Sequence, residues 1–69
     1  MSEHTYKMLE LVGSSQTSIE GAIQNAVAKA EQDEKSLRWF EVEEIRGHIE
    51  GGRIAHWQVR VKIGATMDD

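Results

Sequence analysis

Leucines alternate with other residues near the start of the chain, in the segment from His4 to Val12. Side chains of a strand point alternately to opposite faces, so Leu9 and Leu11 would share one face. This pattern predicts a strand that is covered on one side. The residue types of the next segment, Gly13–Ser15, favour a turn, and we expect the strand to end there.

The following segment has the period of a helix. Thr17 to about Lys35 is the predicted extent, and Ser15 or Thr17 is the expected N-cap, with Glu20 completing a capping box. Small side chains are frequent on the apolar stripe, which predicts that the helix lies close to a sheet. The stripe repeats every three or four residues and consists of Ile19, Ala22, Ile23, Ala26, Val27 and Ala30.

Two further strands are predicted on either side of a glycine pair. The segments Leu37 to Ile49 and Ile54 to Ile63 flank Gly51-Gly52, a favoured two-residue hairpin turn because both positions tolerate positive φ. With this turn, Glu41 lies opposite Lys62 and Glu43 opposite Arg60. Opposite charges across a ladder stabilise pairing, so we take this register as the expected one.

Strict alternation along the hairpin predicts two unlike faces. The first face is apolar at the end away from the glycine turn and should cover the helix there. The second face is polar except for Trp39 and Ile45. The first face contains Phe40, Val42, Glu44, Arg46 and His48 beside Ala55, Trp57, Val59, Val61 and Ile63. The second contains Trp39, Glu41, Glu43 and Ile45 beside His56, Gln58, Arg60 and Lys62.

The order of elements is strand–helix–strand–strand, which is an α+β (β-α-β-β) fold in one domain over residues 1–69. We expect the first and second strands to run in the same direction, with the third antiparallel between them. The chain has 69 residues, and a domain this small usually needs disulfides, a metal or oligomerisation for stability. Cysteine is absent, so oligomerisation is the leading expectation.

Charge and hydropathy limit the classes of binding partner that we expect for this chain. The net charge is −4 and the isoelectric point is near 5.3, which argues against nucleic acid as the main partner. The sequence contains no apolar run of the roughly 18 residues that span a membrane and no visible signal peptide. We expect a soluble, cytoplasmic protein without a membrane partner.

Catalytic chemistry finds little support in the sequence. The serines lie in turn or cap contexts, and Glu41 and Glu43 face cations, which favours ion pairing over proton transfer. Alternation puts His48 and His56 on opposite faces, so they are not expected to share a metal ion within one subunit. Trp57 beside Arg46 is expected to pack in the core with a cation–π contact.

Trp39 is the unexpected residue, because it projects from a charged face. Two interpretations stay open from the residues alone: an anchor at a subunit interface, or a platform on which a planar ligand stacks. Gln58 shares this face, although several residues further along the sheet. Alternation places Arg46 on the other face, unless a bulge near Gly47 reverses it or Arg46 acts from another subunit.

The chain resembles the dodecins, small flavin-binding proteins that assemble into hollow dodecamers. The resemblance covers essentially the whole length and the same order of elements. It is carried by YKMLELVGSS at residues 6–15, AIQNAVAKA at 22–30, WFEVEEIRGHI at 39–49 and HWQVRVKIG at 56–64. In combination and at this spacing, these pieces are fairly specific for the family.

The resemblance implies a three-stranded antiparallel sheet partly wrapped around one helix, in a homo-dodecamer of cubic symmetry. It also implies a flavin, such as FMN or riboflavin, stacked on Trp39 at a two-fold interface, with Gln58 bonded to the ring edge and Arg46 at the site. The protein would then store or sequester flavin, without being an enzyme. The alternative is an oligomeric shell that serves as a structural or partner-binding protein without flavin.

Bacterial dodecins are also associated with coenzyme A, and Tyr6 and Lys29 are the matching candidate residues. This chain departs from those relatives at Asp33 and at Ala65-Thr66, where the relatives often carry an aromatic and a basic residue. The departure argues against coenzyme A binding and predicts a looser outer part of the site.

Overall fold

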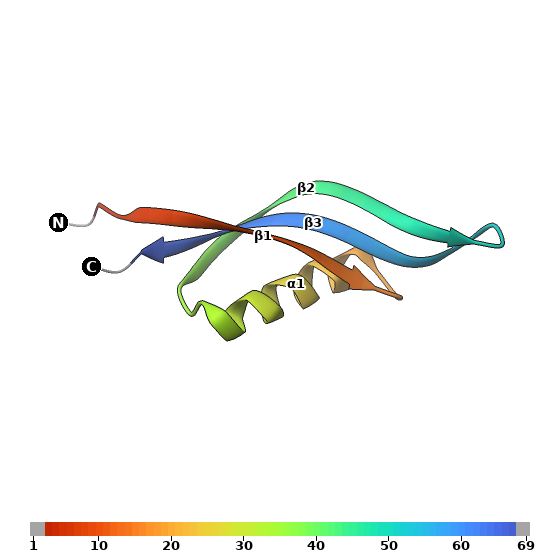
Figure 1. The fold of residues 1–69 in the computed structure, drawn as a ribbon, viewed down its shortest axis with the longest axis horizontal. Helices are drawn as coiled ribbons and strands as arrows, with labels where there is room; N and C mark the ends of the chain where they lie inside the picture. The colour runs from red at the N-terminus through yellow and green to blue at the C-terminus, as the bar shows by residue number, and fades with distance from the viewer. Residues whose placement is uncertain (1–2, 68–69) are drawn as a thin grey trace.

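The computed structural model describes residues 3–67. In chain order it contains β1 (Thr5–Ser15), α1 (Ile19–Asp33), β2 (Leu37–Glu50) and β3 (Arg53–Met67), which confirms the predicted element order. The sheet order is β1-β3-β2, and β3 pairs antiparallel with both neighbours. Figure 1 shows the sheet lying over the helix, with the β2–β3 hairpin extending well beyond it.

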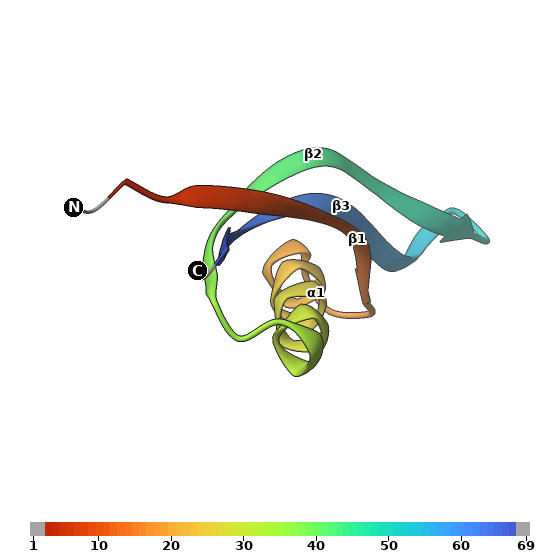
Figure 2. The ribbon, with the colours of Figure 1, turned by 60° about the vertical axis from the view of Figure 1, so that its left-hand side comes forward.

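The sheet curves around the helix (Figure 2), as the fold prediction requires. The core lies between the helix and the central strand, where Val59, Val61 and Ile63 of β3 are fully buried. The small side chains of the helix stripe allow this close approach, since Ala22, Ala26 and Ala30 are the buried residues of α1. The stripe is therefore confirmed, with its larger members Ile19, Ile23 and Val27 packed at the edges of the core.

The first strand is longer than the sequence pattern predicts. The segment Gly13–Ser15 continues β1 rather than turning, and Gly13 lies opposite Val59 on the side of the sheet that faces the helix. A Cβ at Gly13 would overlap the carbonyl oxygen of Ala22. This glycine is needed for close packing of strand and helix rather than for a turn.

The helix also begins and ends inside its predicted bounds. Its N-cap is Ser18, whose Oγ accepts a hydrogen bond from Gly21 N at 2.8 Å, so the expected cap at Ser15 or Thr17 was wrong. The hydroxyl of Ser15 instead accepts from the backbone N–H groups of Thr17 and Ser18. Both serines thus satisfy amide groups at the start of the helix, which have no partners within it.

The hairpin turn is confirmed. Gly51 and Gly52 have φ values of 60° and 77°, the left-handed region that favours glycine. Glu50 lies opposite Arg53 directly beside the turn, and Glu41 lies opposite Lys62 further along, as expected. Both strands are longer than predicted, and β3 continues to Met67.

Between these two points the expected register is wrong. Val42 lies opposite Val61 and Glu44 opposite Arg60, so Glu43 is the extra residue of a β-bulge. A second irregularity, at Ala55, restores the register before the turn. A bulge reverses the alternation of the residues beyond it, and this changes the composition of both faces.

We call the sheet face toward α1 the inner face and the opposite one the outer face. Residues directly opposite each other share a face, so the partners of Gln58 and His56, which are Arg46 and His48, lie on the outer face. Glu44 lies there as well, opposite Arg60, whereas Ile45 joins the inner face opposite Val59. The predicted faces were therefore wrong from Glu44 to His48.

The helix packs on β1 and β3 and leaves most of β2 uncovered. Three inner-face residues of β2 consequently remain exposed, with 49% for Phe40, 42% for Val42 and 51% for Ile45. Apolar side chains aligned on one strand and open to solvent are typical of a surface that another chain covers.

Candidate binding surface on the outer face

Trp39 lies on the outer face of β2, directly opposite Gly64 of the central strand. A Cβ at Gly64 would run into the six-membered ring of the indole, so the ring lies over the bare backbone of this glycine. The ring of Tyr6 meets it edge-on, with centroids 5.0 Å apart and planes at 72°. The indole Nε1–H donates to Oε2 of Glu41 at 3.3 Å. The ring is thus held from three directions, yet Trp39 is still 38% exposed.

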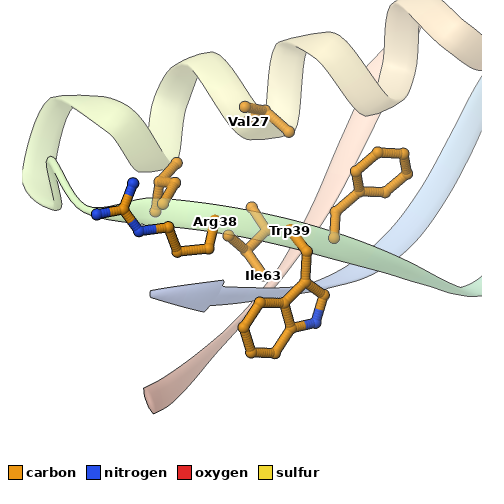
Figure 3. Close-up of a pocket in the computed structure, with 6 residues that line it drawn as sticks. Val27, Arg38, Trp39 and Ile63 are labelled. Carbon is orange, nitrogen blue, oxygen red and sulfur yellow. The ribbon is translucent and has the colours of Figure 1, made fainter. Parts of the chain in front are cut away.

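An apolar hollow of about 170 Å³ lies near this residue but on the helix side of the sheet. Figure 3 shows Val27 of the helix above the hollow and the indole of Trp39 pointing away from it. The hollow and the indole surface are therefore different features. The hollow is lined by Val27, Leu37, Arg38, Trp39, Phe40 and Ile63.

The end of β3 beside Trp39 is fixed by polar contacts. Arg38 Nε donates to Oγ1 of Thr66 at 2.9 Å, and the backbone N–H of Thr66 donates to the carbonyl oxygen of Ser36 at 3.0 Å. Thr66 is buried, so the end of β3 is held firmly against the start of β2, next to Trp39.

Gln58 and Arg46 also lie on the outer face, opposite each other on β3 and β2. The bulge at Glu43 therefore brings Arg46 to the face of Trp39. Gln58 is six positions along β3 from Gly64, the partner of Trp39, which is about 20 Å at the usual rise of a strand. One chain thus presents the three predicted site residues on one face but in two separate groups.

The bulge at Glu43 also makes two other predicted side-chain placements wrong. Trp57 lies opposite Gly47 rather than beside Arg46, and it packs at the edge of the core. His48 and His56 lie opposite each other on one face, with ring centroids 5.4 Å apart and planes at 15°. Their predicted separation on opposite faces was wrong.

Charged residues occupy the middle of the outer face. Arg60 Nη1 contacts Oε2 of Glu10 at 2.8 Å, and Arg60 Nε lies 3.6 Å from Oε1 of Glu44. The hydrogen bond with Glu10 raises the pKa of Arg60, so this guanidinium stays charged. The predicted pair of Glu43 with Arg60 was wrong, since Glu43 instead reaches Lys62, with Oε1 4.0 Å from Nζ.

The two residues considered for coenzyme A do not meet within one chain. Tyr6 lies on the outer face, opposite Thr66, whereas Lys29 is exposed on the helix beneath the inner face. The sheet separates them.

Comparison with known proteins identifies the family. The family model described as Dodecin matches residues 5–68. The chain belongs to the dodecin family. A dodecin from Thermus thermophilus is 42% identical over 64 residues, which are 93% of either chain.

Solved dodecin structures share the whole fold. A dodecin from Streptomyces davaonensis superposes with a TM-score of 0.93 at 44% identity, covering 99% of this chain and 100% of its own. A dodecin from Streptomyces coelicolor gives a TM-score of 0.93 at 46% identity, with coverage of 100% and 99%. The sequence resemblance to the dodecins is therefore confirmed over essentially the whole length.

Sequence reasoning singled out Trp39 as a candidate but missed the groups that hold its ring, which are Gly64, Tyr6 and Glu41. Gly64 was the available signal, because a glycine inside an apolar strand often marks the close approach of another group.

Among residues 3–67, no group of three or more histidine, cysteine, aspartate or glutamate side chains is arranged to hold a metal ion. Within residues 3–67, no helix is long and apolar enough to cross a membrane.

Proposed function

We propose that this dodecin binds a flavin, such as riboflavin or FMN, by stacking the isoalloxazine ring on Trp39. The observation that carries this proposal is the exposed indole on the outer face, where Trp39 is 38% exposed. One side of the indole rests over Gly64, which leaves the other side for a planar ligand. Aromatic rings favour such offset stacking, and a ring that is already held loses little freedom when a ligand binds.

A single chain supplies only half of such a site. Stacking alone leaves a ring free to slide, whereas a primary amide can donate to one edge atom of a flavin and accept from another. Gln58 is the amide on the outer face, but it lies too far from Trp39 for one ring to reach both. We infer that each flavin site is composite, with Trp39 from one subunit and Gln58, together with Arg46, from another.

Self-assembly follows from the same geometry. The exposed apolar residues of β2 need a cover, and a chain of this size gains stability from burying them. The family membership supports a homo-dodecamer as the assembled state. Each chain carries a net charge of −4, so ion pairs between neighbouring subunits are needed to offset part of the repulsion in the assembly.

Storage or sequestration is the role that best fits this site. Stacking on an indole and bonding to an amide hold a flavin without offering it an acid, a base or a nucleophile. The hydroxyls of Ser15 and Ser18 are engaged by the backbone at the start of the helix. Binding without turnover is therefore the proposed activity.

The replacement Trp39→Ala separates this proposal from the alternative of a purely structural shell. If Trp39 is a stacking platform, the variant keeps its oligomer and loses flavin affinity by about 1–3 kcal/mol, the scale of stacking on an aromatic side chain. If Trp39 is an interface anchor, the variant loses the oligomer. Size-exclusion chromatography and a flavin titration of the same preparation measure both quantities.

Gln58→Ala tests the other half of the site. The variant should assemble normally and bind flavin more weakly by about 1–3 kcal/mol, the cost of leaving a buried polar edge without its partner. The measurement is a fluorescence titration at fixed protein concentration, with Gln24→Ala on the helix as the matched control. Unchanged affinity in Gln58→Ala would remove Gln58 from the site.

A further inference from the structure

Two of the three histidines of the chain face each other on the outer face. His48 of β2 and His56 of β3 are direct cross-strand partners, and their rings stack with centroids 5.4 Å apart and planes at 15°. The pair lies in the hairpin half of the sheet, away from Trp39. The side chain of His48 is 54% exposed, so the pair is open to solvent in the subunit.

Two imidazoles at directly opposite positions are well placed to chelate one metal ion. A zinc ion lies about 2.0–2.1 Å from each histidine nitrogen, so the two ligating nitrogens must come within roughly 4 Å of each other. Paired strands already hold the two Cβ atoms about 4.5–5.5 Å apart. His48 is exposed and His56 is half-buried, so rotation of the two rings can bring these nitrogens together while the backbone stays in place.

The neighbours of the pair also suit metal binding. Oε2 of Glu50 lies 3.3 Å from Nε2 of His48, and a carboxylate bonded to a ligating imidazole is a common outer partner in metal sites. Nε2 of Gln58 lies 3.4 Å from Nε2 of His56. Both rings are thus oriented by a polar side chain two residues further along the same strand.

We propose that His48 and His56 together bind one divalent transition-metal ion, of the class of Zn²⁺, Ni²⁺ or Cu²⁺. Imidazole nitrogen favours these ions over Mg²⁺ and Ca²⁺, which prefer oxygen ligands. The described residues offer two protein ligands at this point, so water or a group from another subunit completes the coordination. This proposal does not rest on the proposed flavin site, although Gln58, which contacts His56, belongs to both.

Isothermal titration of the assembled, tag-free protein with Zn²⁺ and Ni²⁺ tests the proposal. All proteins carry His4→Gln, so that the third histidine, near the start of the chain, contributes nothing. The parent should bind up to one ion per chain, and His48→Gln or His56→Gln should weaken binding at least ten-fold. Glu50→Gln should weaken it by up to roughly 10–100-fold, the usual effect of losing an outer partner, while the matched change Glu20→Gln on the helix should have no effect.

Two results of this titration would overturn the proposal. Absence of binding in the parent does so, as does binding that survives either histidine replacement in an oligomer of unchanged size. If a variant fails to assemble, the electron paramagnetic resonance spectrum of Cu²⁺ in the His4→Gln parent decides. Two coordinated imidazole nitrogens support the paired site, and one or none contradicts it.

Discussion

Gly64 and Trp39 form one structural unit at the scale of residues. The indole covers the backbone of Gly64, the ring of Tyr6 packs against it at 72°, and Glu41 accepts from its N–H. A side chain at position 64 would take the space of the ring. The orientation of the proposed stacking platform therefore depends on a residue that has no side chain.

The variant Gly64→Ala should displace the indole. We expect a loss of about 1–3 kcal/mol in the free energy of unfolding, the usual cost of inserting a methyl group into a packed site, together with weaker flavin binding. Chemical denaturation at fixed protein concentration and the tryptophan emission spectrum measure the effect. Combining it with Trp39→Phe, which has a smaller ring, should restore part of the stability. An emission spectrum and a denaturation midpoint like those of the parent would show that the ring does not depend on Gly64.

At the scale of elements, the hydroxyl of Ser18 is the N-cap of the helix. Ser18 Oγ accepts from Gly21 N, so Ser18→Ala leaves an amide of the first turn without its partner. Loss of such an N-cap costs about 1 kcal/mol, which denaturation monitored by circular dichroism can resolve. Ser14→Ala, a replacement of an exposed neighbour, is the control. Equal stability of the two variants would contradict the assignment of Ser18 as the cap.

The sequence predicted the elements but not the bulge at Glu43 in β2. Periodicity determined the helix stripe, and the glycine pair determined the turn, because both are local properties. The bulge at Glu43 was missed because Glu43 and Glu44 are adjacent and either can face a cation. Arg60 contacts Glu44, and Glu43 reaches Lys62, so charge pairing could not distinguish the two registers.

A signal for the bulge was nevertheless present. Uniform alternation would place Ile45 among charged residues and Arg46 and His48 among apolar ones. One extra residue before Ile45 corrects all three positions, and the structure contains it. The placement of Arg46 and of the histidine pair could have been predicted from this mismatch, whereas the contacts of Trp39 with Tyr6 and Glu41 required the folded chain.

At the scale of the whole molecule, the proposed composite site makes flavin binding depend on assembly. Co-assembly of Trp39→Ala chains with Gln58→Ala chains tests this directly. If the two side chains of a site come from different subunits, some sites in the mixed oligomer contain both, and flavin affinity reappears that neither variant has alone. Refolding the mixture and titrating flavin measures the recovery. A mixture that binds no better than the separate variants would mean that each chain uses its own pair.

The most direct measurement of the central claim is the fluorescence of riboflavin or FMN during titration with the parent protein. A flavin stacked on Trp39 should lose its emission, because the indole donates an electron to the excited ring. We predict saturable quenching at micromolar protein and flavin, reduced in Trp39→Ala. Emission that stays unchanged at these concentrations would contradict flavin binding by this protein.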